Sequence, residues 1–124
     1  MTAGSGNVSL RNRTRETLLA ADAVVADTFL SRLVGLLGQR PTWARASRGL
    51  WIIPSHGVHT LGMRFAIDVI FLDRNKTVVH IEENLRPWRV SRVIASARSV
   101  LELPASTIAR SHTTIGDQIE VFGS

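Results

Sequence analysis

The run from Ala66 to Leu72, AIDVIFL, constrains the fold more than any other stretch of this chain. It is apolar at every position except Asp68, and the polar turn at residues 73–76 closes it. Such a run is typical of a central β-strand that is covered on both faces. Side chains alternate along a strand, so the even-numbered residues share one face and the odd-numbered residues share the other. The sequence therefore predicts that Asp68 lies between apolar neighbours on a buried face.

A carboxylate in that position must be paired, hydrogen-bonded or neutralised, because an isolated buried charge is too costly to keep. The expected partners of Asp68 are Arg64, His59 and the backbone N–H groups of residues 57–62. As a structural group, Asp68 would pin that loop by accepting its N–H bonds. As a functional group, it would be a general base or a ligand anchor with a perturbed pKa. The structural role is favoured because no second acid or nucleophile is aimed at Asp68.

Other strands are expected at shorter alternating runs. Thr77 to Glu82 alternates between two faces, and the turn at 73–76 joins it to the first run, which predicts a β-hairpin over residues 66–82. Two further runs stop at a proline, which cannot donate to a sheet. The additional strands are expected over residues 17–26 (or a strand pair broken near Asp22), 49–53, 99–103 and 118–122.

Helical spacing is clear after Thr28, a typical N-cap residue, and predicts one main helix over residues 28–37. A short second helix is expected at about 105–111. Residues 1–9 are small and polar and are expected to form a disordered tail, which leaves one domain over residues 10–124. Many strands with one main helix predict the α+β class, as a β-rich, mostly antiparallel mixed sheet or small barrel.

Composition excludes several classes of site. The chain has no cysteine, which rules out disulfides, thiolate metal sites and thiol catalysis. It has neither a run of about 20 apolar residues nor an N-terminal hydrophobic signal region, so we expect a cytoplasmic protein without membrane insertion. The net charge of +5 comes from 14 arginines and one lysine. Because these are spread over the whole chain, GC-rich codon usage explains them better than a partner such as nucleic acid or an acidic membrane.

Histidine and hydroxyl residues precede the central run. His56 and His59 are three residues apart, a spacing that suits metal binding on neither a strand nor a helix, so no metal site or other cofactor is expected. A triad of Thr60, His59 and Asp68 can be drawn, but adjacent strand residues point to opposite faces. No G-x-S-x-G or phosphate-binding glycine motif is present, so no catalytic motif is recognised.

Arginines flank Trp88 around Pro87, in the sequence RPWRVSR. An aromatic ring beside positive charge is the composition that binds single-stranded nucleic acid. A nucleic-acid site would also need further aromatic residues on the same face, and the sequence does not supply them. The favoured interpretation is a loop in which Trp88 packs over the barrel edge, while the arginines are solvated or pair with Glu82, Glu83 or Glu102.

The order of segments along the chain resembles one family. RLVGLLGQ, HTLGMRFAIDVIFLD, VVHIEENLRPWR, VLELPA and IGDQIEV follow one another as in the domain of unknown function 192 family, also called uncharacterised protein family 0127. The resemblance covers about residues 17–122 and implies a compact β-rich α+β domain with no established activity. Many relatives have Trp-Met-Lys-Asn-Thr where this chain has residues 60–64. The residues that match the family pattern are Asp68, Asp73, Glu102, Gly116 and Asp117.

The leading hypothesis for function is a non-enzymatic binding or accessory module, with a polar groove formed by residues 55–64 and 83–90 around Asp68. One alternative is a small hydrolase or metal-assisted enzyme that uses Asp68 with His56 or His59. The other is an Arg-rich nucleic-acid binder, which is less favoured than an anionic ligand or a protein partner. The candidate ligand-binding residues are His56, His59, Thr60, Arg64, Asp68, Arg86 and Trp88.

Overall fold

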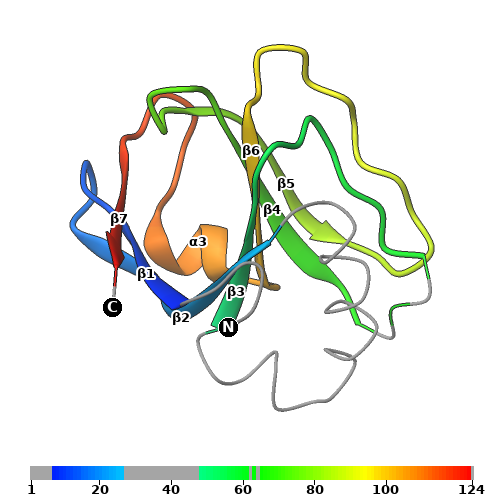
Figure 1. Cartoon of the computed structure of the whole chain (residues 1–124). Helices are drawn as coiled ribbons and strands as arrows, with labels where there is room; N and C mark the ends of the chain where they lie inside the picture. The colour runs from blue at the N-terminus through cyan, green and yellow to red at the C-terminus, as the bar shows by residue number, and fades with distance from the viewer. Residues whose placement is uncertain (1–6, 27–47, 62, 64, 124) are drawn as a thin grey trace.

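A computed structural model describes residues 7–26, 48–61, 63 and 65–123 of the protein. Within these residues, seven strands form one sheet in the order β5-β4-β6-β3-β2-β1-β7 (Figure 1). The elements are β1 (Asn7–Asn12), β2 (Thr17–Ala26), β3 (Arg48–Ile52), β4 (Ile67–Leu72), β5 (Val78–Leu85), β6 (Ser99–Pro104), the short helix α3 (Thr107–Ser111) and β7 (Ile119–Gly123).

The sheet is mixed and strongly curled. β2 and β3 pair in parallel, whereas the other neighbouring strands pair antiparallel. At one end the two edge strands are linked, because Thr77 and Gln118 form an antiparallel bridge and the N–H of Val78 donates to the carbonyl of Asp117 at 2.8 Å. The result is a half-barrel, and α3 lies inside its curl (Figure 1).

β4 lies between β5 and β6 in this half-barrel, and all six of its residues are buried. Ile70 and Leu72 face the interior, where they pack with residues of β6, β2 and α3. Ile67, Val69 and Phe71 face outward and are covered by a second hydrophobic cluster. The predicted strand with two covered faces is therefore confirmed, and so is the buried position of Asp68.

All of the predicted strands are present, with bounds that differ by a few residues at most. The hairpin of β4 and β5 forms around the predicted turn, in which Asp73 accepts the N–H groups of Asn75 and Thr77 at 2.8 and 3.0 Å. β2 is one strand and continues through Asp22. The predicted main helix at 28–37 lies outside the described residues. In the described ranges, no helix has the length and apolar character needed to span a bilayer.

The predicted tail at 1–9 is wrong at its C-terminal end. β1 begins at Asn7 and pairs with β2 on one side and with β7 on the other. The polar sequence NVSLRN did not predict this strand. The strand is stabilised by backbone pairing on both edges and has only one fully buried apolar side chain, Leu10.

Asp117 ties β1 to the turn before β7. It is 3% exposed and accepts hydrogen bonds from the side chains of Asn12 and Arg15 and from the N–H of Thr114, each at 3.0 Å. Burial by itself raises the pKa of Asp117, but the bonds from Arg15, Asn12 and Thr114 outweigh it and hold the pKa below its ordinary value. The ionised carboxylate therefore fastens the point at which the first and last strands meet.

Candidate functional site

Two loops cover the outward face of β4: the first loop, residues 53–61, and the second loop, residues 86–94. They run side by side as an irregular antiparallel pair. The N–H groups of Ser91 and Ile94 donate to the carbonyls of Val58 and His56, both at 2.9 Å. Val58 and Ile94 also pack on the outward cluster of β4. The loops are therefore fixed to the sheet from below and to each other along their length.

Thr60 of the first loop determines the shape of the second loop. Its side chain is fully buried. The hydroxyl donates to the carbonyl of Arg86 at 2.6 Å and accepts the N–H of Arg89 at 2.9 Å. The backbone of Thr60 adds two further bonds, donating to the carbonyl of Arg89 at 2.8 Å and accepting the N–H of Trp88 at 3.0 Å. One buried residue thus closes residues 86–89 into a turn.

This turn presents Trp88 to solvent. The backbone of Trp88 is left-handed, with φ of 62°, which is unfavourable for a residue with a side chain. Its side chain is 65% exposed. The prediction that Trp88 packs over the barrel edge is therefore wrong, because the bonds from Thr60 hold the turn in a conformation that directs the ring outward. A large exposed aromatic ring on a rigid turn is typical of a contact site.

An open cleft of about 480 Å³ lies beside this turn, where β5 ends. Within the described residues, Arg86, Arg89 and Arg92 form no ion pair with a carboxylate. These arginines are exposed, which was one of the two predicted alternatives. Pairing with Glu82, the other alternative, is absent, because Glu82 accepts the backbone N–H of Arg92 at 2.8 Å and lies 3.3 Å from His80. The cleft is lined by Glu82, Glu83, Asn84, Leu85, Arg86 and Arg89.

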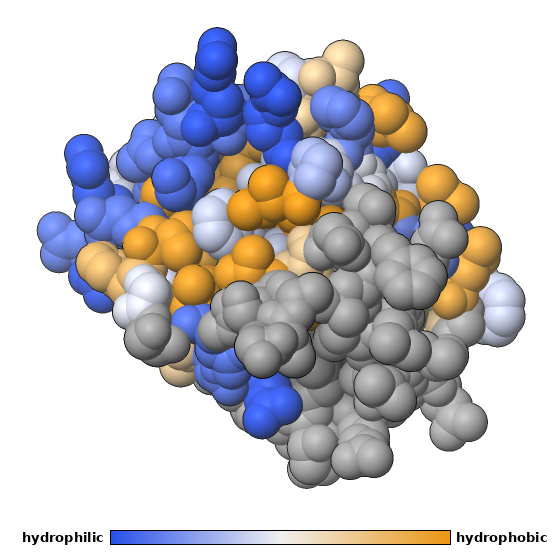
Figure 2. Space-filling view, viewed as in Figure 1, coloured by the Kyte–Doolittle hydropathy of each residue, from blue (hydrophilic) through white to orange (hydrophobic). Residues whose placement is uncertain are grey.

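Apolar side chains are exposed on the same two loops. Leu61, Val90 and Val93 are 50%, 69% and 77% exposed, and His59 pairs with Val90 in a β-bridge. Figure 2 shows hydrophobic atoms at the right of the view, on the side where Figure 1 draws these loops. We call the exposed side chains of the two loops the loop surface; it comprises the apolar Leu61, Trp88, Val90 and Val93 and the arginines 86, 89 and 92. Its three aliphatic members were not predicted, although apolar and cationic residues are interspersed in RPWRVSRV.

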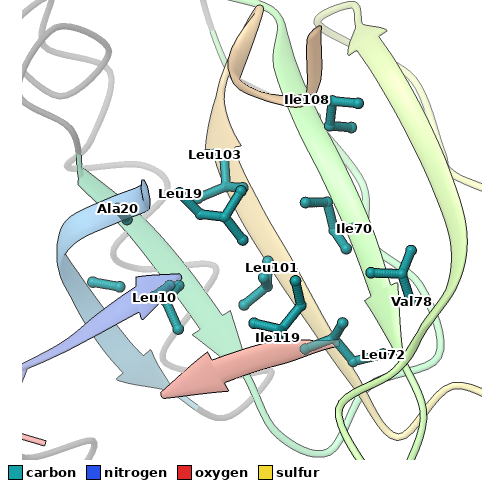
Figure 3. Close-up of a cluster of buried hydrophobic side chains, with 11 residues drawn as sticks. Leu10, Leu19, Ala20, Ile70, Leu72, Val78, Leu101, Leu103, Ile108 and Ile119 are labelled. Carbon is teal, nitrogen blue, oxygen red and sulfur yellow. The ribbon is translucent and has the colours of Figure 1, made fainter. Parts of the chain in front are cut away.

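Asp68 lies on the opposite face of β4 from the two loops and is fully buried. One carboxylate oxygen accepts the N–H of Asn84 and the other accepts the N–H of Ile108, both at 2.8 Å. Ile108 points into the same interior as Ile70 (Figure 3). The predicted donors at residues 57–62 are wrong, because the first loop packs on the odd-numbered side of β4. Asp68 therefore joins β4, β5 and α3, and it does not line the cleft.

The predicted histidines do not build a catalytic group with Asp68. His56 is exposed, and His59 accepts the N–H of Leu61 on its Nδ1 atom at 3.3 Å. The hydroxyl of Thr60 is used by the backbone of the second loop, so the triad of Thr60, His59 and Asp68 is not assembled. Arg64 lies outside the described residues. Among the residues that the structure describes, no three His, Cys, Asp or Glu side chains gather as metal ligands.

Glu102 is a second buried acid, at the centre of β6. It lies opposite Leu50 in β3 and Val69 in β4, and it is 6% exposed. Burial raises its pKa from the ordinary value of 4.5 to about 7. The carboxyl group is therefore poised to change its protonation state near neutral pH. In the sequence, Glu102 was recognised as a residue that matches the family pattern and as a possible partner of the arginines near Trp88.

Comparison with known proteins places this fold in a family. The family model described as DUF192, "Uncharacterized ACR", matches residues 10–121. The chain belongs to this family. The resemblance seen in the order of sequence segments is thereby confirmed.

Two relatives of this DUF192 chain carry the description UPF0127 protein. The protein from Pyrococcus furiosus is 32% identical over 114 residues, which cover 88% of this chain and 94% of the relative. The protein from Pyrococcus horikoshii is 31% identical over 116 residues, which cover 90% of this chain and 96% of the relative.

Two crystal structures share the fold. A protein of unknown function from Novosphingobium aromaticivorans aligns with a TM-score of 0.69 at 18% identity, over 92% of this chain and 83% of that one. A Sinorhizobium meliloti protein, provisionally described as a transcription regulator, aligns with a TM-score of 0.74 at 22% identity, over 98% and 97% of the two chains. At these identities the similarity extends to the fold alone.

Proposed function

We propose that this domain is a non-enzymatic binding module and that the loop surface, with the adjoining cleft, is its binding face. The observation that carries the proposal is the exposed side chain of Trp88 on a turn held by buried Thr60. Tryptophan and arginine are the side chains most enriched where proteins bind their partners. Here both types project from one short turn.

The hydrogen bonds that hold the two loops in one conformation favour binding of a partner. A loop that already has its bound shape loses little conformational entropy on association, which increases affinity. Thr60 and the pairing of the two loops supply that order through backbone hydrogen bonds, which do not depend on a ligand. The first and second loops together carry three arginines and no carboxylate, so an anionic partner suits these loops, whereas the adjoining cleft also presents Glu82 and Glu83.

An enzymatic function has weaker support. Asp68, the acid that the sequence singled out, is closed to solvent and is satisfied by two backbone N–H groups. A general base must come within hydrogen-bond reach of a substrate proton, and a fully buried carboxylate does not. The residues of the cleft supply charge and shape without a nucleophile–base pair.

The test is a mapping experiment on the isotope-labelled full chain. Amide resonances are followed during titration with three separate probes: a short poly-glutamate peptide, a single-stranded DNA oligonucleotide and anionic lipid vesicles. We expect at least one probe to perturb residues 86–93 and 58–61 specifically, and we expect Trp88→Ala to weaken that binding by about tenfold or more. Ile115→Ala is the matched control, because Ile115 is 61% exposed near the opposite end of β5.

Two results would overturn the proposal. One is that every probe that binds perturbs residues elsewhere, or that no probe perturbs the loop surface. The other is that Trp88→Ala and Ile115→Ala bind all probes as tightly as the unchanged protein does.

A further inference from the structure

We infer that the partner of the loop surface is an anionic lipid bilayer, to which the domain docks peripherally. This inference rests on the proposed function and names the partner for the same face. It follows from three properties of the loop surface: the chemistry of its apolar residues, the distribution of its charges and the rigidity of its turn.

The apolar members favour a bilayer over nucleic acid. Three of the four are aliphatic: Leu61, Val90 and Val93. Nucleic-acid bases stack on aromatic faces, for which this surface has only Trp88 within the described residues. Aliphatic side chains gain by entering the acyl-chain boundary instead, and tryptophan is enriched at the level of the lipid headgroups. All four side chains are at least half exposed, so each has area to bury.

The charges favour anionic headgroups. Arg86, Arg89 and Arg92 are interspersed with the exposed apolar residues, so Trp88, Val90 and Val93 are each next to an arginine in the sequence. Basic residues next to an apolar surface bind acidic lipids through the negative potential of the leaflet. The nearest acids in the sequence, Glu82 and Glu83, belong to β5, and Glu82 is engaged by the N–H of Arg92.

The turn is suited to shallow docking. Thr60 fixes residues 86–89 through four hydrogen bonds, and the left-handed backbone of Trp88 directs its ring away from the domain. The side chain can therefore enter a membrane interface without any rearrangement of the sheet beneath. The docked domain stays folded, and only the outer side chains of the two loops enter the lipid.

The experiment is co-sedimentation of the full chain with two kinds of vesicle: phosphatidylcholine alone, and phosphatidylcholine mixed with phosphatidylserine. We expect binding to the mixed vesicles, little binding to phosphatidylcholine, and weaker binding as salt rises. Trp88→Ala and Val93→Ser should each reduce partitioning to mixed vesicles by about fivefold or more, since each removes buried apolar area. Arg89→Gln should lower binding to the mixed vesicles and should leave the weak binding to phosphatidylcholine unchanged. Ile115→Ser, a change at an exposed apolar side chain elsewhere, should leave binding unchanged.

Tryptophan fluorescence gives an independent readout. The difference spectrum between the unchanged protein and Trp88→Ala isolates Trp88, and it should shift to shorter wavelength when mixed vesicles are added. Thermal melting of each variant confirms that it is folded, as expected for changes at exposed side chains.

The outcomes separate the two proposals. If the poly-glutamate peptide or the oligonucleotide engages the loop surface and the mixed vesicles do not bind, the bilayer inference is wrong and the binding module stands. If Trp88→Ala, Val93→Ser and Ile115→Ser all bind mixed vesicles like the unchanged protein, the attraction is only the general one of a basic protein, and the bilayer inference is again wrong. If no probe engages the loop surface, both proposals fail.

Discussion

The carboxylate of Asp68 accepts the backbone N–H of Ile108, 40 positions later in the chain, at 2.8 Å. Its other oxygen accepts the N–H of Asn84, a residue with left-handed backbone at the irregular end of β5. A single buried side chain thus fixes the helix inside the half-barrel and the end of the strand that leads to the second loop. In this way the interior of the half-barrel is connected to the second loop.

Asp68→Asn should destabilise the domain by about 1–3 kcal/mol without changing its fold. An amide has one acceptor oxygen, so its NH₂ group would face the N–H of either Asn84 or Ile108 and leave that donor unpaired. Urea denaturation measures the free energy of unfolding. Glu83→Gln, at an exposed position, serves as the control, and an unchanged midpoint for Asp68→Asn would contradict the structural role.

Thr60→Val should cost about 2 kcal/mol, because it keeps the side-chain volume and removes the hydroxyl between Arg86 and Arg89. Thr60→Ser retains the hydroxyl and should lose much less. Hydrogen exchange at the Arg89 amide gives a local readout, which should speed up in the valine variant only. Equal exchange rates in the two variants would show that the hydroxyl does not hold the turn.

Gly57→Ala should push the two loops apart and destabilise the protein by about 1–3 kcal/mol. A Cβ atom at this position would lie 2.9 Å from the carbonyl oxygen of Arg92, which is backbone and cannot swing away. Gly123→Ala is the matched control, since a Cβ there meets nothing within 4 Å. Calorimetric melting should separate the two variants, and similar melting temperatures would argue against tight loop pairing.

Glu102→Gln should flatten the dependence of stability on pH. The raised pKa means that between pH 4.5 and about 7 the folded protein holds a proton that the unfolded chain has released. The stability of the unchanged protein therefore falls as pH rises through this window, by about 3 kcal/mol at most, and levels off above it. Denaturation at pH 4.5 and pH 8 should show a smaller difference for Glu102→Gln. An identical difference in both proteins would mean that Glu102 titrates normally.

The contribution of Asp117 to stability is lost only at more acidic pH, below its ordinary pKa of 3.8, so it does not mask the effect of Glu102.

The strands could be predicted because their information is local. Alternation and flanking turn residues indicated β4, β5 and the hairpin between them, and the lone acid in an apolar run indicated that Asp68 is buried. The donors to Asp68 could not be predicted, because they depend on how far the sheet curls. That curl brings α3 to the even-numbered side of β4 and leaves the first loop on the other side.

In the candidate site, too, local features could be predicted and features that depend on distant contacts could not. Arg86 and Trp88 could be chosen from composition, since an aromatic residue among arginines is a local signal. The exposure of Trp88 could not be foreseen, because it results from bonds to Thr60, whose hydroxyl acts 29 residues away at Arg89. Thr60 itself was chosen as a possible nucleophile. Its hydroxyl instead satisfies two backbone groups, a use that no sequence motif marks.

The pairing of β1 with β7 sets an order of events during synthesis. Val8 lies opposite Gly123, so β1 is translated well before the strand that pairs with this edge. While the ribosome is still translating, β1 can pair with β2, but its other edge has no neighbour. The half-barrel is completed only when β7 has left the exit tunnel, and until then that edge of β1 is open to a chaperone or another nascent chain.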